Sequence, residues 1–323
     1  MKNAINIRFL LNEMLLNPNY TNKNSYEIIN FIHNNLNEEF CSIEPVLSYS
    51  SDVYVLDFNN KKFLIKIRPV DTLMRLSTET KALEVLSKEI ITPNIIVYGV
   101  ALDYEVIIYD YIESNLNIKN TFLDEQSIYA IWELILTIQN TLLTRSDLFC
   151  FTKDRVQTYA LNVHRYTSKY IGEKIPLNIL TVLDKKLCLP QFSNRITVFS
   201  DRSLANWIFS KKSIIPIDFD LLFLEPCLAD FIQFIDHHEL QSVYDRDSLI
   251  SKCLSFLNQK NIFYSDDDFH FHALYRNLVQ GAIFYQQNKL VSLWHYEKAL
   301  SSSLFLGEVS LEKQIKKILV EVA

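Results

Sequence analysis

The spacing of hydrophobic residues changes about one third of the way along this 323-residue chain. Up to residue 112, short apolar runs alternate with polar positions and end at turn residues, which is typical of β-strands. One segment in this region, 79–90, instead places Ala82, Leu83 and Leu86 at helical spacing. The predicted strands are 43–49, 52–58, 62–69, 95–102 and 105–112. The pattern therefore predicts a five-stranded antiparallel sheet with one main helix.

Helical spacing dominates the rest of the chain. Residues 5–40 predict two helices ahead of the sheet, and from residue 121 onward apolar residues recur mostly every three or four positions. A broad apolar face over 124–143 is typical of a buried central helix. Further helices are predicted at 175–187, behind Pro226, and through most of the remaining chain.

Length and composition support two lobes. A chain of 323 residues can bury two cores, and its hydrophobic content of 49% and charged content of 22% are ordinary for a soluble globular protein. We expect an α+β fold. Its lobe 1–112 would be a small antiparallel sheet with a helical extension, and its lobe 113–323 would be larger and mostly helical.

Charge and cysteine usage narrow the class of protein. The net charge of −6 argues against a nucleic-acid binder and favours tolerance of cationic partners. The five cysteines are odd in number and lack C-x-x-C spacing, which predicts neither a disulfide framework nor a zinc site. The N-terminus lacks a signal-peptide pattern, and no apolar run approaches the ~18 residues of a membrane span. We therefore expect a cytoplasmic protein without membrane contact.

One hairpin, within residues 198–220, interrupts the helical region. The apolar segment 206–209 leads into the turn sequence SKKS, and 214–220 returns. Paired strands rise ~3.3 Å per residue side by side, so Asn206 and Asp218 are expected at the same end of this hairpin.

The hairpin carries a candidate chemical centre. The side chains of Asn206 and Asp218 offer the oxygen ligands that suit Mg²⁺ held through a nucleotide's phosphates. Asp201 could accept a proton from an attacking hydroxyl, a division of labour found in protein kinases. The alternative is an ordinary turn, because Asp and Asn favour turns wherever they occur.

A lysine in the third predicted strand points to the same chemistry. Lys66 lies within the apolar run FLIKIRP, where a charge is costly unless it is paired. Glu79, thirteen residues on, opens the predicted helix and could pair with it, leaving the ammonium aimed at phosphate oxygens. The alternative is two separate solvated charges.

A small polar turn precedes the second strand. Ser50, Ser51 and Asp52 could offer backbone N–H groups and hydroxyls to phosphates, although a plain β-turn explains them equally well. The chain has only four glycines, so any phosphate-binding loop must work without a glycine-rich sequence.

These motifs occur in a familiar order. They are FLIKIRP with Lys66, ETKALEVL with Glu79, IIYDYIE, SDRSLANW, IPIDFD and EPCLADF. Together they resemble the aminoglycoside phosphotransferase and choline-kinase-like branch of the protein-kinase-like fold, from about residue 43 to 236. The resemblance implies two lobes with a nucleotide in the cleft.

The resemblance implies roles for the hairpin region. Asp201 matches the catalytic base of the family. Asn206 and Asp218 match its Mg²⁺ ligands, and Asp230 matches an acidic residue that braces the catalytic loop.

It also implies nucleotide-binding residues. Lys66 matches the phosphate-binding lysine and Glu79 matches its partner. The segment around Asp110 and Tyr111 matches the hinge, whose backbone groups would meet the adenine.

Three features depart from the family pattern. Phe199-Ser200-Asp201 stands where a histidine usually lies two residues before the base, the nucleotide loop has no glycine, and Glu225 replaces a frequent glycine or aspartate. Ser200 leaves open the alternative of a kinase-like nucleotide-binding or regulatory protein that is inactive or weak in transfer.

We expect an ATP- or GTP-dependent, Mg²⁺-assisted phosphotransferase that phosphorylates a hydroxyl of a small molecule, such as an antibiotic, a sugar or an amino alcohol. A protein substrate is not supported, because no activation segment of useful length separates Asp218 from Asp230. Acidic residues beside many aromatic ones in the C-terminal region favour a cationic acceptor, with Asp220 helping to hold it. The oligomeric state stays open.

Overall fold

The computed structural model of the protein divides into two compact units. The first comprises Met1–Asn115 with Ile208–Leu221, and the second comprises Leu116–Trp207 with Leu222–Ala323. The predicted lobes split the chain once, near residue 112, whereas here a segment of the hairpin region groups with the sheet. The described residues are 22–36, 42–46, 51–58, 61–70, 75–114, 123–148, 196–210, 213–220, 222–285 and 288–322.

The first unit is built on the predicted five-stranded sheet. Its strands are β1 (Ser42–Val46), β2 (Asp52–Phe58), β3 (Lys61–Pro69), β4 (Ile95–Ala101) and β5 (Tyr104–Asp110). The order is β1-β2-β3-β5-β4, and every neighbouring pair is antiparallel, as the sequence predicted. Among the described strands β1 pairs with β2 alone, and Pro45 is tolerated on such an edge strand, where a missing N–H need not break a ladder.

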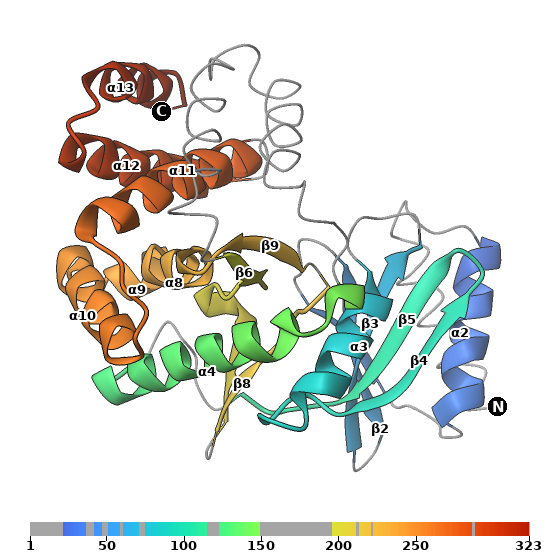
Figure 1. The fold of residues 1–323 in the computed structure, drawn as a ribbon. Helices are drawn as coiled ribbons and strands as arrows, with labels where there is room; N and C mark the ends of the chain where they lie inside the picture. Colours follow the sequence, from blue (N-terminus) through green and yellow to red (C-terminus); the bar gives the residue numbers. More distant parts are fainter. Residues whose placement is uncertain are drawn as a thin grey trace. The chain divides into compact units, whose positions relative to one another are not determined.

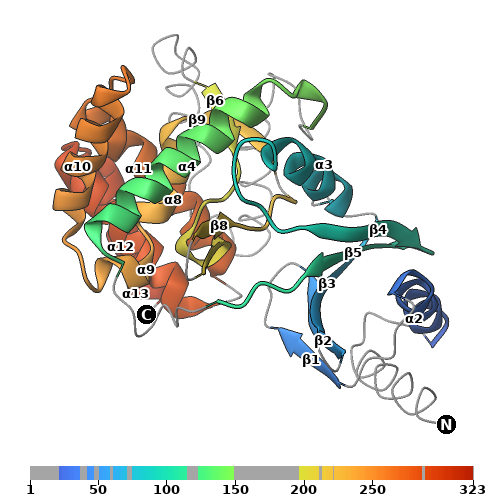
Figure 2. The same ribbon diagram turned by 90° about the horizontal axis from the view of Figure 1, so that it is seen from below.

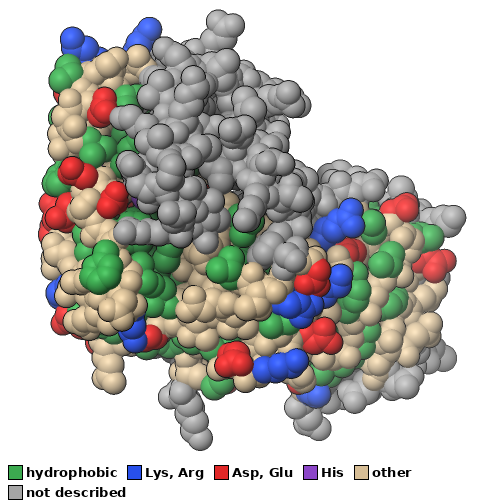
Figure 3. Space-filling model, in the orientation of Figure 1, with side chains coloured by type: hydrophobic (Ala, Val, Ile, Leu, Met, Phe, Trp, Pro, Cys, Tyr) green, Lys and Arg blue, Asp and Glu red, His purple; other side chains and the backbone are tan. Residues whose placement is uncertain are grey.

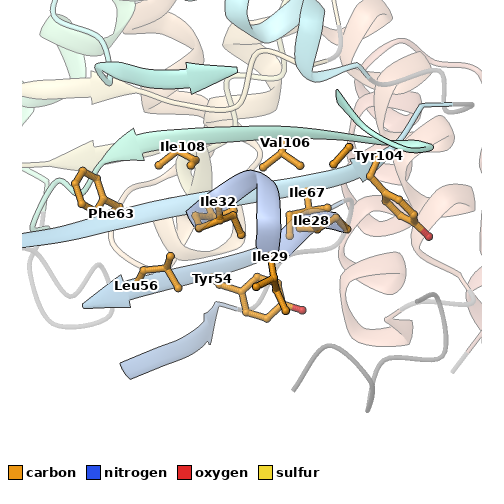
Figure 4. Packing of buried hydrophobic residues seen from close by; sticks show 12 residues of the cluster. Ile28, Ile29, Ile32, Tyr54, Leu56, Phe63, Ile67, Tyr104, Val106 and Ile108 are labelled. Atoms are coloured by element: carbon orange, nitrogen blue, oxygen red, sulfur yellow. The ribbon is translucent and has the colours of Figure 1, made fainter. Parts of the chain in front are cut away.

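Helix α2 (Asn22–Leu36) covers one face of this sheet. Its residues Ile28, Ile29 and Ile32 are buried and lie against apolar side chains from β2, β3 and β5 (Figure 4). Successive side chains of a strand point to opposite faces, so β3 sends every second residue into this core. These β3 residues are Phe63, Ile65 and Ile67.

A glycine lets α2 approach the edge strand β4. A Cβ atom added at Gly99 would lie 2.5 Å from Cε2 of Phe31 in α2, closer than real contacts permit. Gly99 therefore gives the Phe31 ring its place against the sheet, and any side chain there would require this ring to shift.

Helix α3 (Leu76–Leu86) lies on the opposite face, so that the sheet is held between α2 and α3 (Figure 2). Leu76, Leu83 and Leu86 are buried, and so is Glu79, which is 3% exposed. The face beneath α3 also receives the alternate β3 residues Lys66 and Arg68, both buried. One face of the sheet is therefore an apolar core and the other holds buried charges.

The second unit is mostly helical (Figure 1). Its longer helices are α4 (Glu125–Leu143), α8 (Leu228–Ile235), α10 (Arg246–Gln259), α11 (Asp266–Phe284), α12 (Lys289–Phe305) and α13 (Val309–Val322), with a short α9 (His238–Gln241) between α8 and α10. α4 is the predicted buried helix, with Trp132 fully buried. Ser265 and Asp268 form a capping box at the start of α11.

Two pairs of short strands carry the region of the predicted centre. β6 (Ile196–Phe199) pairs antiparallel with β9 (Phe223–Pro226), and β7 (Trp207–Phe209) pairs with β8 (Ile214–Pro216) as the predicted hairpin. Strand β9 is not predictable from the sequence, because four residues ending in proline are too few to show a strand period. Helix α8 does begin behind Pro226 as expected.

Some predictions fall outside the described residues, namely the first N-terminal helix and the helix at 175–187. Among the helices that are described, none is long and apolar enough to cross a bilayer. On the face drawn in Figure 3, acidic and basic side chains both occur among hydrophobic and neutral ones over the described surface.

Candidate active site

The first unit holds a compact ion cluster around Lys66. The Lys66 Nζ atom lies 2.7 Å from Glu79 Oε2, 2.6 Å from Asp218 Oδ1 and 3.0 Å from Asp220 Oδ2. These partners come from α3 and from the segment after β8, so three distant parts of the sequence meet at one ammonium group. The expected Lys66–Glu79 pair is present, and the two solvated charges of the alternative are not observed.

Electrostatics in this cluster are dominated by burial and by the crowding of carboxylates. Burial alone would lower the pKa of Lys66, but Asp218, Glu79 and Asp220 outweigh it and raise that pKa above its usual value. Burial raises the pKa of Asp220 to about 7, with Asp218 and Glu79 adding to the effect while Lys66 and Arg68 oppose it. The cluster therefore carries more negative charge than one ammonium group neutralises.

Arg68 extends the cluster toward the turn before β2. It lies two residues after Lys66 on the same face of β3 and is 1% exposed. Its Nη1 lies 2.7 Å from Asp220 Oδ2, and its Nη2 donates a 2.8 Å hydrogen bond to Ser51 Oγ. Arg68 thus links Ser51, a predicted phosphate-binding residue, to the segment that follows β8.

The arrangement of acidic groups suits a cation. Glu79, Asp218 and Asp220 each offer a carboxylate oxygen, and these oxygens all lie within 4.8 Å of one another. Asp218 is the least buried of the three. Hard divalent cations such as Mg²⁺ prefer oxygen ligands of this kind, but here the Lys66 ammonium lies among all three carboxylates, so the predicted Mg²⁺ ligands Asn206 and Asp218 stay a prediction.

The second unit holds the loop of Asp201, between β6 and β7. The backbone N–H groups of Ser200 and Arg202, on either side of Asp201, donate to the Asp230 carboxylate at 3.3 Å and 3.0 Å. Asn206 Nδ2 donates to the Asp201 carbonyl oxygen at 2.6 Å. The loop is therefore fixed through its backbone on both sides of the predicted base.

Asp230 is the anchor of this loop and is fully buried at the start of α8. Burial raises its pKa, opposed by the nearby Arg202 guanidinium and by the hydrogen bonds that it accepts. The Arg202 side chain, also fully buried, donates through Nε to the Ser200 carbonyl oxygen at 2.9 Å and lies over the Trp207 ring. The loop is anchored in this way without the histidine that the resemblance led us to look for.

The hinge residues lie at the end of β5. The Asp110 N–H donates to the Asn94 carbonyl at 3.1 Å, and the Tyr111 N–H donates to the Lys62 carbonyl at 3.2 Å. Both N–H groups are thus used within the sheet. An adenine ring would therefore have to hydrogen-bond to the carbonyl groups of Asp110 and Tyr111, or to a neighbouring residue. Their role stays a prediction.

The remaining predicted site residues have different outcomes. Ser50 lies outside the described residues. Asn206 belongs to the second unit and Asp218 to the first, so joint coordination of a metal ion by these two stays a prediction. Asp220 is 3% exposed and paired with two cations, a position that favours holding Lys66 and Arg68 over contact with an acceptor.

Sequence reasoning missed several buried charges. Arg68 could have been found, since it shares a face and an apolar run with Lys66. Glu225 pairs with Arg276 at 3.0 Å, and this arginine also lies 3.8 Å from the centroid of the Phe199 ring at the start of the Asp201 loop. No local pattern signals Arg276, because it lies in helix α11, 51 residues from Glu225 in strand β9.

Comparison with known proteins gives structural matches only. No protein-family model and no curated protein sequence matches the chain. A choline kinase from Streptococcus pneumoniae is similar with a TM-score of 0.62 at 15% identity, over 88% of this chain and 99% of that chain. A microcompartment-associated aminopropanol kinase has a TM-score of 0.59 at 10% identity, over 87% and 98%. A spectinomycin phosphotransferase has a TM-score of 0.51 at 13% identity, over 92% and 96%. At these identities the likeness concerns the fold, and the chain has the protein-kinase-like fold of small-molecule kinases.

Proposed function

We propose that this protein is an ATP- or GTP-dependent phosphotransferase that phosphorylates a hydroxyl group of a small molecule. The observation that carries the proposal is the 2.7 Å ion pair between Lys66 of β3 and Glu79 of α3, with Asp218 at 2.6 Å from the same ammonium. A strand lysine paired with a helix glutamate, near a metal-binding aspartate, is the arrangement that kinases use to hold nucleotide phosphates.

Each residue then has a defined task. Lys66 binds phosphate oxygens, and Glu79 keeps its ammonium in place. Asp201 accepts the proton of the acceptor hydroxyl as that oxygen attacks the terminal phosphate. Asp218 and the amide oxygen of Asn206 would hold Mg²⁺, which neutralises phosphate charge when bound. The Asn206 amide nitrogen already donates to Asp201, which is consistent with leaving the amide oxygen for a cation.

The nucleotide has to compete for Lys66. An ammonium group has three N–H donors, and three carboxylates lie within 3.0 Å of this one. Phosphate oxygens can reach Lys66 only if one carboxylate gives way. Asp218 is the candidate, because it is partly exposed and because a divalent cation would take over its charge.

The acceptor is best described as a class. Structurally similar proteins include kinases of choline and aminopropanol and a phosphotransferase crystallised with ADP and spectinomycin. The substrates of these similar proteins, together with the net charge of −6 of this chain, favour an amino alcohol or amino sugar that carries a positive charge. The buried position of Asp220 weakens the prediction that it holds this acceptor. An unchanged KM for the acceptor in Asp220→Asn would contradict that prediction.

A regulatory, non-transferring protein is the second candidate, and Ser200 is the feature that favours it. Against it, the Ser200 N–H and the buried Asp230 anchor the loop in the absence of a histidine side chain. Transfer and binding can be separated by experiment.

The test combines a melting assay with a transfer assay. Mg²⁺ with ATP or GTP should raise the melting temperature, since a ligand at a hundredfold excess over Kd stabilises the native state by ~2.7 kcal/mol. Transfer of labelled terminal phosphate should then be screened over amino alcohols, aminoglycosides and neutral sugars. The absence of any shift with either nucleotide would overturn the nucleotide site. A shift without transfer to any acceptor would favour the regulatory alternative.

A further inference from the structure

Helix α3 starts without a side-chain cap from its own N-cap residue, Arg75. The first four N–H groups of a helix have no partner inside the helix, so each needs another acceptor. The Arg75 N–H donates to the carbonyl oxygen of Asp220 at 3.1 Å, and the Thr78 N–H donates to the Arg75 carbonyl at 3.1 Å. Two groups at the helix start, those of Leu76 and Ser77, remain.

A side chain from the sheet satisfies both of them. Glu105 Oε2 accepts from the Leu76 N–H at 2.8 Å, and Glu105 Oε1 accepts from the Ser77 N–H at 3.1 Å. The Tyr98 hydroxyl of β4 donates to the same Oε1 at 2.9 Å and fixes the carboxylate from the other side. Glu105 is only 4% exposed, and the positive end of the helix dipole favours its charge.

This cap joins the helix to the strands that carry the ion cluster. Glu105 lies on β5 directly opposite Arg68 of β3. Lys66 lies two residues before Arg68 on the same face of β3, opposite Ile107 of β5. Glu79 lies three residues after Leu76, in the turn that Glu105 holds. Two carboxylates on the same short stretch of helix therefore connect to the sheet, one capping the helix and one pairing with Lys66.

We propose that Glu105 is a positioning residue of the phosphotransfer site, which fixes the start of α3 so that Glu79 meets Lys66. This inference rests on the proposed function of the cluster. Without the cap, α3 can rotate or shift on the sheet, and the Lys66–Glu79 pair is made in only part of the population.

The first experiment measures nucleotide affinity by titration calorimetry. If Glu105→Gln lowers the paired population to about one tenth, the Kd for Mg²⁺–ATP rises about tenfold, because apparent affinity falls with the competent fraction. The matched control is Asp245→Asn, which makes the same carboxylate-to-amide change at the cap of α10, where Asp245 accepts from the Ser248 N–H. The control should leave the Kd unchanged.

A double-mutant cycle separates positioning from general stability. If Glu105 acts through Glu79, then adding Glu105→Gln to Glu79→Gln weakens nucleotide binding by less than twofold. Independent structural damage would instead multiply the two losses. Tyr98→Phe, which removes only the donor to Glu105, should raise the Kd in the same direction by a smaller factor.

The outcomes are distinct. Glu105→Gln that melts like the wild type and binds Mg²⁺–ATP within twofold of it would overturn the role of Glu105, as would a multiplicative cycle. If Glu105→Gln does not fold, an unchanged Kd in Tyr98→Phe overturns the role and a raised Kd supports it. A wild-type protein that binds no nucleotide would overturn the proposed function, and the role of Glu105 with it.

Discussion

The loops of Asp201 and Asp218 share one backbone feature but are held in different ways. Each presents an aspartate with left-handed backbone, φ 53° at Asp201 and φ 65° at Asp218. Around Asp201 the bonds run from backbone N–H groups to one buried carboxylate, Asp230. Asp218 instead makes a side-chain ion pair with Lys66.

The two loops differ in whether a bound ligand can replace the interactions that hold them. Backbone bonds to a buried side chain have no competitor in a nucleotide or a metal ion, so the Asp201 loop keeps one geometry. Ion pairs between side chains compete directly with phosphate oxygens and cations, so the Lys66 cluster can rearrange when a ligand binds. We therefore expect substitution of the anchor Asp230 to affect the fold, and substitutions in the Lys66 cluster to affect ligand binding.

Asp230→Ala should have the largest effect. It removes the acceptor of two backbone N–H groups and a negative charge that interacts with the fully buried Arg202, and breaking a buried charge pair typically costs about 3–5 kcal/mol. Urea unfolding followed by circular dichroism measures this loss. A decrease in unfolding free energy below about 1 kcal/mol, within the range of ordinary substitutions, would show that Asp230 is not the anchor.

Asp201→Asn should affect chemistry alone. If Asp201 is the general base, kcat falls by about 10²–10⁴-fold while the nucleotide Kd and the unfolding free energy stay at wild-type values. The measurement is steady-state transfer with the best acceptor from the screen. More than about a tenth of wild-type kcat in this variant would exclude a general-base role.

Asp218→Asn should sharpen the contrast between the loops. Lys66 keeps Glu79 and Asp220, so the stability of the free protein should change by less than about 1 kcal/mol. The extra stabilisation by Mg²⁺ and nucleotide, ~2.7 kcal/mol at a hundredfold excess over Kd, should be lost. Thermal melts with and without ligand test both parts, and a loss of stability without ligand would contradict the exchangeable ion pair.

Mild acid should lower the unfolding free energy by a smaller amount, through a histidine of the second unit. Burial lowers the pKa of His295, in the second unit, from 6.5 to about 4. Between these values the unfolded chain binds a proton that the folded chain does not, so stability is complete above pH 6.5 and falls as the pH drops toward 4. Because the ring is partly exposed, we expect a loss of roughly 1 kcal/mol between pH 7 and 5. His295→Gln should flatten this dependence in urea unfolding, and an unchanged slope would contradict it.

The sheet was predictable because its signal is local. Alternating runs gave all five strands, and Lys66 and Glu79 stood out as charges inside apolar patterns whose pairing follows once β3 and α3 pack together. The Asp201 loop was recognisable from the order of motifs, although the resemblance pointed to a histidine that this chain lacks.

The missing parts depend on contacts far apart in sequence. Glu105 reads as an ordinary polar residue of an alternating strand, and only the packing of α3 shows that it caps a helix that begins 29 residues earlier. Strand β9 is too short to show a period, and its partner β6 lies across the whole hairpin. The pattern of a single sequence therefore indicates neither the capping of α3 by Glu105 nor the pairing of β9 with β6.

The discontinuity of the first unit has a consequence for the order of events during synthesis. The sheet and α3 leave the ribosome first, yet Asp218 and Asp220, which supply counter-charges to the buried Lys66 and Arg68, follow after the segment Leu116–Trp207. At about 5–20 residues per second, these roughly ninety residues take roughly 5 to 20 s to appear. During that interval the nascent sheet lobe carries cations that lack these counter-charges, so a fragment that stops near residue 115 should stay incompletely folded and be prone to capture by chaperones.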